Sequence, residues 1–161
     1  MVDPLPRLLF VCVENSCRSQ MAEGFARSKA PGRVAACSAG SRPSGRVDPR
    51  AIQFMAERGV DIARQASKGL DDLPEGGWDC IVTMGCGDAC PHLPARRRVD
   101  WDLPDPKPLD DAGFRNVRDR IERLVEKLLA ETGAQLEVPG PAPEAPGRTA
   151  EAPGPTPEAR R

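Results

Sequence analysis

The chain has 161 residues, 39% of them hydrophobic and 29% charged, and this composition suits one domain with a buried core. The net charge of -1 leaves no overall field to attract nucleic acid or an anionic membrane. Because the longest apolar run spans only residues 8–13, and no basic region precedes a hydrophobic stretch of signal-peptide length, we expect a cytoplasmic protein without a membrane or nucleic-acid partner.

The first predicted strand, loop and helix lie within residues 8–29. Residues 8–13 (LLFVCV) form a continuous apolar run typical of a buried parallel strand, and QMAEGFARSK has helical spacing. Five residues separate Cys12 from Arg18 in the turn between them. A turn this tight is expected to direct its amides at one small space beside the positive end of the helix, where a tetrahedral oxyanion binds. The predicted oxyanion-binding residues are Val13, Glu14, Asn15, Ser16, Cys17 and Arg18.

Three side chains of this stretch gain chemical roles. The helix N-terminus and Arg18 both favour thiolate over thiol, so we expect the pKa of Cys12 to lie below the value of about 8.5 for free cysteine. Arg18 offers a planar fork of donors that can hold two oxygens of an anion. Ser19 can donate its hydroxyl to the sulfur of Cys12. The predicted chemistry is attack of this thiolate on the central atom of a bound oxyanion, and the alternative is a buried strand cysteine beside a surface arginine.

The same spacing recurs between Cys90 and Arg96. Pro91 and Pro94 lack amide hydrogens there, and no helical pattern follows. We interpret this second match as coincidental, because only the first is flanked by strand, loop and helix in the required order.

Strands and helices alternate along the rest of the chain. Strands are predicted at residues 33–38, 78–84 and 98–103, and helices at residues 49–58 and 109–129. The last helix is amphipathic, since its apolar residues step by three and four. This alternation predicts an α/β fold, an open four-stranded parallel sheet with helices on both faces, and ligands outside the carboxyl ends of the strands.

The composition changes at residue 137 to proline, glycine, alanine and glutamate, and EAPG occurs twice. A segment without large aliphatic or aromatic residues after Val138 cannot bury enough surface to offset the ordering of its backbone. We therefore predict a domain at residues 1–136 and a disordered tail at residues 137–161. A proline-rich docking ligand is the alternative, although no aromatic anchor accompanies the prolines.

Two further cysteines, Cys86 and Cys90, follow the third strand in GCGDACP, so their loop is expected at the same sheet edge as Cys12. Two thiols beside a nucleophilic one favour thiol–disulfide exchange, which simple hydrolysis does not need. A zinc site that includes Cys80 and His92 is the alternative, but the close-spaced cysteine pairs typical of zinc are absent, and we predict no metal. The other cysteines are expected to be packing residues: Cys17 and Cys37.

Asp105 is a candidate proton donor. Prolines on both sides hold its segment, WDLPDPKP, extended as it leaves the fourth strand at the edge where Cys12 is expected. A carboxylic acid there can protonate a leaving oxygen. A surface carboxylate in a proline-rich turn is the simpler alternative.

Taken together, FVCVENSCRSQMAEGFA, CSAGSRP, TMGCGDACP and DWDLPDP resemble the arsenate reductases built on the low-molecular-weight tyrosine phosphatase fold, over about residues 8–129. The resemblance implies reduction of arsenate to arsenite, with phosphate or sulfate as mimics of the substrate. By matching motif positions, it makes Cys12 the nucleophile, Arg18 the oxyanion clamp, Ser19 the thiolate partner and Asp105 the general acid.

The resemblance also implies a route for electrons. Reduction of As(V) to As(III) takes two electrons, so a second thiol must attack the Cys12 adduct and leave a disulfide. In thioredoxin-coupled relatives the residue matching Cys86 makes this attack and the one matching Cys90 takes over the bond. In other relatives a small thiol such as mycothiol, served by mycoredoxin, attacks first. We expect thioredoxin as the donor, no tightly bound cofactor, and a monomer.

Three departures from the family pattern stand out. Cys86 and Cys90 are closer together than the loop cysteines of the best-known three-cysteine relatives, and GCGDACP also resembles relatives that use mycothiol, which leaves mycothiol as an alternative donor. Lys107-Pro108 follows Asp105-Pro106 where the family commonly has Ala-Gly. Some relatives bind potassium near the loop that corresponds to residues 13–18. Lys68 stands where that site has a carboxylate, so we predict no bound potassium. The residues that match the site are Asn15, Glu23 and Ser38.

Two other functions compete with arsenate reduction. A true phosphatase would use Cys12, Arg18 and Asp105 on phosphotyrosine, although PKP after the acid provides no aromatic wall for a phenol. The other is a non-catalytic module, either stabilised by zinc or acting as a thiol sensor, that binds an oxyanion or arsenite without turning it over.

Overall fold

The computed structural model describes residues 4–85 and 93–133. The predictions for Cys86, Cys90 and His92, and for the tail at residues 137–161, therefore lie outside the described residues. The division of the chain at residue 136 stays a prediction for the same reason.

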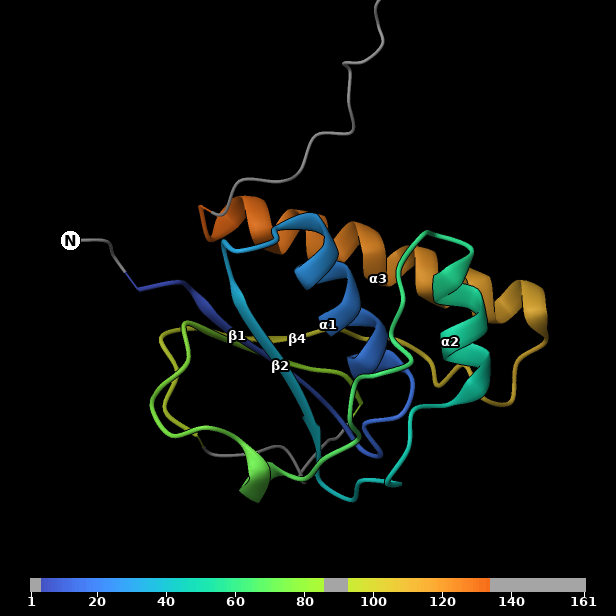
Figure 1. The fold of residues 1–161 in the computed structure, drawn as a ribbon, viewed down its shortest axis with the longest axis horizontal. Helices are drawn as coiled ribbons and strands as arrows, with labels where there is room; N and C mark the ends of the chain where they lie inside the picture. Colours follow the sequence, from blue (N-terminus) through green and yellow to red (C-terminus); the bar gives the residue numbers. More distant parts are fainter. Residues whose placement is uncertain (1–3, 86–92, 134–161) are drawn as a thin grey trace, which may run out of the picture.

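Four parallel strands form one sheet, in the order β2-β1-β3-β4 (Figure 1). They are β1 (Arg7–Cys12), β2 (Ala35–Gly40), β3 (Cys80–Thr83) and β4 (Arg98–Asp100). The central strand β1 pairs with both β2 and β3, which explains its uninterrupted apolar sequence, because both of its faces are covered. The predicted four-stranded parallel sheet is confirmed. Its third strand is shorter than residues 78–84, since Trp78 makes only an isolated bridge to Ala95.

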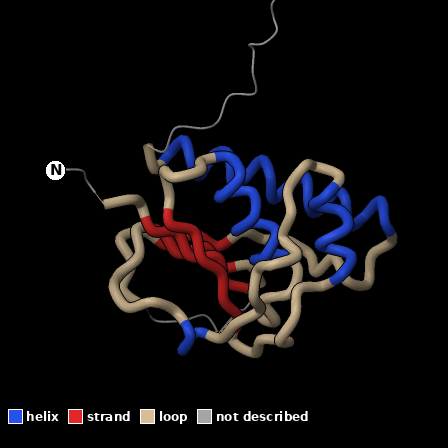
Figure 2. The backbone as a smooth tube through the Cα atoms, viewed as in Figure 1, coloured by secondary structure: helices blue, strands red, loops and turns tan. Residues whose placement is uncertain are grey.

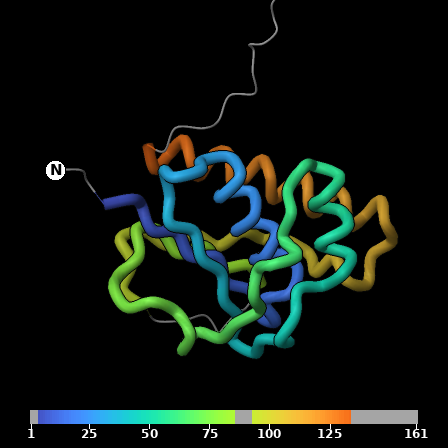
Figure 3. The backbone as a smooth tube through the Cα atoms, viewed as in Figure 1, coloured from blue at the N-terminus to red at the C-terminus, as the bar shows by residue number. Residues whose placement is uncertain are grey.

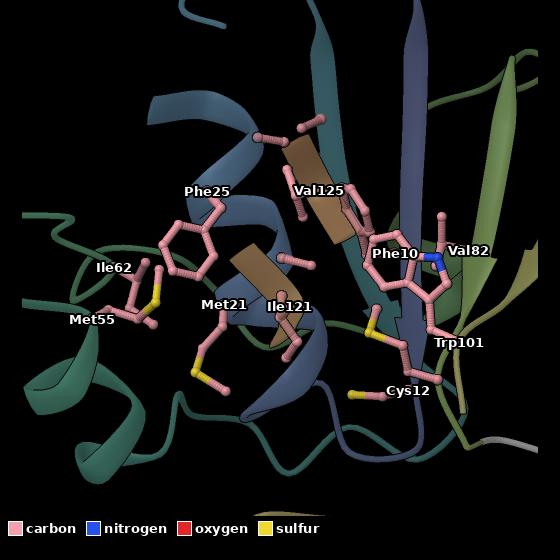
Figure 4. Packing of buried hydrophobic residues seen from close by; sticks show 14 of the residues in the cluster. Phe10, Cys12, Met21, Phe25, Met55, Ile62, Val82, Trp101, Ile121 and Val125 are labelled. Atoms are coloured by element: carbon pink, nitrogen blue, oxygen red, sulfur yellow. The ribbon is translucent and has the colours of Figure 1, made fainter. Parts of the chain in front are cut away.

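The three α-helices of the described residues are α1 (Arg18–Lys29), α2 (Pro49–Ala56) and α3 (Asp111–Glu131). All three contribute to the same hydrophobic cluster, over one face of the sheet (Figure 2). Met21 and Phe25 of α1 and Ile121 of α3 pack there with Phe10 of β1, as Figure 4 shows. The sequence predicted helices on both faces of the sheet, whereas all three described α-helices pack on one face.

The opposite face of the sheet is covered differently. The short 3-10 helix η1 (Leu70–Asp72) and the loops around it pack on this face. Residues alternate along β1, so Leu8 and Phe10 face the α-helices while Leu9 and Val11 face the η1 side. In the described part of the chain, the layers are therefore three α-helices, a sheet, and a thinner layer of loops with one 3-10 helix.

Side-chain caps set the starts of two helices. The carboxylate of Asp48 accepts a hydrogen bond from Arg50 N (2.8 Å) ahead of α2, and Pro49 occupies the first turn. The carboxylate of Asp110 accepts from Gly113 N (2.9 Å) ahead of α3. Helix α2 ends two residues before the predicted position 58, because the chain turns there into Gly59, whose φ of 75° suits glycine.

The loops that leave the carboxyl ends of β1 and β2 lie side by side. Residues 13–17 contact residues 42–48 through backbone hydrogen bonds, and Figure 3 shows these blue and teal segments together at one edge of the sheet. The segment after β4 reaches the same edge, where Arg50 of α2 binds its backbone. Within residues 4–85 and 93–133, no helix has the length and apolar character needed to cross a membrane.

Candidate oxyanion-binding active site

The carbonyl groups of the loop after β1 all bond away from the loop. Each accepts a hydrogen bond from a neighbouring segment: Val13 O from Arg42 N (2.8 Å), Glu14 O from Ser44 N (3.0 Å), Asn15 O from Gln20 Nε2 (3.0 Å) and Ser16 O from Asp48 N (3.0 Å). In a trans peptide the N–H of the next residue lies on the opposite side. The amides of Glu14 to Cys17 therefore point to the inner side of the loop, as an oxyanion cradle requires.

Gly40 allows this loop to lie close to the end of β2. A Cβ atom at this position would lie 2.5 Å from Val13 O and 2.9 Å from Asn15 N. Only glycine permits such an approach of two backbones. The conformation of the anion loop, residues 13–17, therefore depends on Gly40, which follows Asn15 by 25 positions in the sequence.

Cys12 lies at the end of β1, below the loop, and is 3% exposed. Its Sγ lies 2.9 Å from Ser19 Oγ, as the sequence predicted for the thiolate partner. The same hydroxyl oxygen accepts a hydrogen bond from Asn15 Nδ2 at 2.7 Å. Because the oxygen already serves as an acceptor for Asn15, the hydroxyl hydrogen is available for the sulfur.

Two donors fix the direction of the Asn15 side chain. Asn15 Oδ1 accepts from Lys68 N (2.8 Å) and from Gln20 Nε2 (3.0 Å), so the amide nitrogen must face Ser19. Among the described residues, Asn15 is the non-glycine residue with a positive φ, 50°, a conformation that asparagine tolerates better than most residues. The network holds Ser19 in the orientation that stabilises a negative sulfur.

Arg18 is the first residue of α1 and lines the same cavity as Cys12. Its Nη1 donates to Leu103 O at 3.0 Å, in the segment after β4. Gly85, after β3, has a φ of 79°, and a Cβ there would lie 2.7 Å from this nitrogen. The guanidinium is thus held between two loops, at the mouth of the cradle.

The cavity has a volume of about 210 Å³ and brings together residues from two distant parts of the sequence. Asp105 and Lys107 line it from the segment after β4, opposite the anion loop. The side chain of Asp105 is exposed, and its Oδ1 accepts from Lys107 N at 3.1 Å. The structure therefore places Asp105, the predicted proton donor, in the same cavity as Cys12.

The other described cysteines lie in environments that disfavour a thiolate. Burial and the charge of Asp48 raise the pKa of Cys17 far above its ordinary value. Burial and the charge of Glu23 raise the pKa of Cys37, and burial raises the pKa of Cys80. These three residues remain protonated thiols at neutral pH, in agreement with the packing role predicted for Cys17 and Cys37.

Two of the residues matched to a potassium site, Ser38 and Glu23, contact each other. Ser38 Oγ donates to Glu23 Oε1 at 2.5 Å, and Arg27 forms an ion pair with Glu23 at 2.8 Å. Lys68 Nζ lies 4.0 Å from Glu23 Oε1. The buried carboxylate is thus neutralised by side chains of this chain, and the predicted absence of potassium stays a prediction.

The arginine of the second cysteine–arginine match lies away from this site, while its cysteine is outside the described residues. Arg96 is exposed and pairs with Asp79 at 3.7 Å, ahead of β3 and β4. It therefore lies toward the amino ends of the strands, at the sheet edge opposite Cys12.

Three residues of the site were not assigned these roles from the sequence: Gln20, Arg50 and Lys107. Gln20 is fully buried on the face of α1 that packs inward, so a polar residue at an apolar helical position would have pointed to it. Arg50 donates to Lys107 O (3.1 Å) and Leu109 O (2.9 Å), which no local pattern indicates.

The fold and the loop define a class of protein, one with a candidate oxyanion site between a buried cysteine and an arginine at the carboxyl edge of a parallel sheet. Residues 7–138 match the model of the low molecular weight phosphotyrosine protein phosphatases. The chain belongs to this family.

Several relatives carry a more specific name. The glutaredoxin arsenate reductase of a Synechocystis species is 38% identical over 130 residues, which cover 79% of this chain and 98% of the relative. A solved arsenate reductase in the phosphate binding state has a TM-score of 0.71 and 37% identity, over 79% of this chain and 98% of the other. A thioredoxin-dependent arsenate reductase of Corynebacterium glutamicum has a TM-score of 0.70 and 33% identity, over 83% of this chain and 64% of the other.

Proposed function

We propose that this protein reduces arsenate to arsenite, with Cys12 as the nucleophile. The observation that carries the proposal is the hydrogen-bond chain from Asn15 through Ser19 to the Cys12 sulfur, beneath a loop whose amides point inward. Relatives named arsenate reductase, similar over nearly their full length, support a reductase within the family.

Binding comes first. The amides of Glu14 to Cys17 and the fork of Arg18 hold the oxygens of a tetrahedral oxyanion, with Cys12 behind the central atom. Phosphate and sulfate have the same shape and act as unreactive mimics. The solved relative in the phosphate binding state supports this class of ligand.

The thiolate of Cys12 then attacks arsenic. A bond from Sγ to arsenic forms as one As–O bond breaks, and the leaving oxygen takes a proton from Asp105 and departs as water. Ser19 stabilises the sulfur before attack, and Arg18 stabilises charge on the remaining oxygens.

Reduction follows when a second thiol attacks the Cys12 sulfur. The S–S bond forms, the electron pair of the As–S bond stays on arsenic, and arsenite leaves as two thiols become one disulfide. We assign this attack to Cys86. Cys90 then attacks Cys86, which frees Cys12 and leaves a Cys86–Cys90 disulfide.

We propose thioredoxin as the external reductant, with no tightly bound cofactor, and a cytoplasmic monomer. One relative is named as thioredoxin-dependent, while another carries the name of glutaredoxin, a donor that the sequence had not suggested. Mycothiol with mycoredoxin is the remaining alternative. If a small thiol attacks the adduct directly, Cys86→Ser should leave turnover with that thiol largely intact. If the relay is internal, Cys86→Ser should stop turnover.

Hydrolysis of phosphotyrosine is the second candidate, favoured by the family model. Among the described residues, the lining of the cavity includes no aromatic side chain to pack against a phenol ring.

One pair of assays separates the candidates. Arsenate-dependent NADPH oxidation with thioredoxin and thioredoxin reductase is measured beside hydrolysis of an aryl phosphate. We expect reduction, its loss in Cys12→Ser, and its retention in Cys37→Ser as the matched control. Strong hydrolysis without NADPH oxidation, or full activity of Cys12→Ser, would contradict the proposal.

A further inference from the structure

An ion pair connects the two walls of the cavity. Lys107 Nζ bonds to Glu14 Oε1, although the two residues are 93 positions apart in the sequence. Glu14 belongs to the anion loop and Lys107 to the segment after β4, and both line the cavity with Cys12. Their side chains are 50% and 36% exposed, which places the pair at the rim, where an entering anion passes.

The charges around the cavity make this pair important for binding. Arg18 and Lys107 carry positive charge, while Glu14 and the thiolate that the proposed reaction places at Cys12 carry negative charge, so these four groups cancel. Asp105 adds no charge in that reaction, because it holds the proton for the leaving oxygen. A doubly charged oxyanion therefore enters a cavity with no excess of positive charge, unless the carboxylate of Glu14 is directed elsewhere.

The ammonium of Lys107 remains charged in this setting. Burial lowers its pKa, but the hydrogen bond and negative charge of Glu14 outweigh this effect, so the pKa of Lys107 lies above its ordinary value. The pKa of Glu14 is lowered for the same reason, through its bond to Lys107. An ammonium has three donors, so it can contact a bound oxyanion without leaving Glu14 entirely.

The backbone of Lys107 is fixed even though its side chain lies at the rim. Lys107 N donates to Asp105 Oδ1 at 3.1 Å, and Lys107 O accepts from Arg50 Nη1 at 3.1 Å. Proline on either side restricts the backbone further. The side chain thus starts from a defined point, and its choice of partner, Glu14 or an oxyanion, is the degree of freedom that remains.

We propose that Lys107 binds an oxygen of the substrate oxyanion and that Glu14 opposes this binding by competing for the same ammonium. Lys107 is then a substrate-binding residue that raises affinity, and Glu14 sets how much of its charge the anion receives. This inference rests on the proposed binding of arsenate. Beyond that binding, the two partners of one ion pair have opposite effects on affinity for the oxyanion.

The test compares neutral variants of both partners. Lys107→Met should weaken binding of inorganic phosphate, measured by calorimetry, about fivefold. It should raise KM for arsenate by a similar factor with kcat nearly unchanged, because the charge acts on the bound anion. Glu14→Gln should strengthen phosphate binding and lower KM about twofold. A purely structural ion pair would instead weaken binding in both variants.

Two further variants complete the design. Lys107→Arg keeps the positive charge and should keep phosphate affinity within about twofold, which separates loss of charge from damage to the fold. Lys127→Met, on α3 and outside the cavity, is the matched control for loss of one lysine and should bind phosphate as the parent does. The salt dependence of phosphate affinity should be smaller in Lys107→Met than in the parent protein.

The outcomes separate this inference from the proposed function. Opposite shifts in phosphate affinity support it whether or not arsenate is reduced. Shifts in the same direction, or none, overturn it even if arsenate reduction is normal. A failure of NADPH oxidation in a parent protein that binds phosphate would overturn only the reductase assignment.

Discussion

Ser19 Oγ lies 2.9 Å from Cys12 Sγ and 2.7 Å from Asn15 Nδ2. All three residues are buried, and the donors around Asn15 leave its amide one orientation. The hydroxyl is therefore oriented as a donor to the sulfur before any substrate binds. This arrangement supports the nucleophilic role that we propose for Cys12.

Ser19→Ala removes this donor. A hydrogen bond to a charged sulfur is worth more than a neutral one, so we expect alkylation of Cys12 by iodoacetamide at neutral pH to slow about tenfold. Arsenate kcat/KM should fall by a similar factor. Ser28→Ala, an exposed serine on the same helix, is the control and should alkylate at the parent rate. Equal rates in both variants would show that Ser19 does not stabilise the thiolate.

Gly40→Ala places a methyl group against the anion loop. The clash with Val13 O should cost about 2 kcal/mol of unfolding free energy in urea and weaken phosphate binding, because the loop must shift. At Gly77 a Cβ would lie 3.6 Å from its nearest neighbour, so Gly77→Ala provides a matched control. Parent-like phosphate affinity in Gly40→Ala would mean that the loop tolerates displacement.

Arg50→Ala frees the segment that carries Asp105 and Lys107. Arg50 bonds two carbonyls of this segment with one guanidinium, so its loss should lower kcat for arsenate by on the order of tenfold to a hundredfold through misplacement of Asp105. Arg50→Lys should not restore activity, since an ammonium lacks the planar fork. Arg58→Ala removes an arginine paired with Glu122 at the surface, and its kcat should match the parent. Parent-like kcat in Arg50→Lys would contradict this expectation, because it would mean that the positive charge at position 50 is sufficient without the two hydrogen bonds of the guanidinium.

Glu57→Gln tests the pH dependence of stability. Hydrogen bonds from Arg115 and Arg118 of α3 lower the pKa of Glu57 to about 2 from 4.5. Because the folded-state pKa is depressed, the ion pairs stabilise the protein above about pH 4.5, and this contribution disappears as the pH falls toward 2.

Urea unfolding at a series of pH values measures this effect. The parent should exceed Glu57→Gln in stability near neutral pH, and the difference should shrink progressively between about pH 5 and about pH 2. Glu75→Gln, at an exposed loop position, is the control for removal of one carboxylate. A difference that stays constant across this range would exclude an ionised Glu57 as its source.

Local sequence determined the elements that flank the anion loop. The apolar run of residues 8–13 and the helical spacing after Arg18 predict β1 and α1 because hydrophobic periodicity reports on neighbours within one or two turns. The fixed spacing of Cys12, Arg18 and Ser19 likewise placed all three at one loop. The succession of strands and helices along the chain likewise followed from the sequence pattern alone.

Tertiary structure decided what meets across the site. The pairing of Glu14 with Lys107, the direction of Asn15 set by Lys68 N, and the hold of Arg50 on residues 107–109 each join segments more than 50 residues apart. The placement of all three described α-helices on one face belongs to the same category. Hydrophobic periodicity predicts which face of a single helix or strand is buried, but not which loops the order of strands in the sheet brings together. The contacts that orient the side chains of this site are made between those loops.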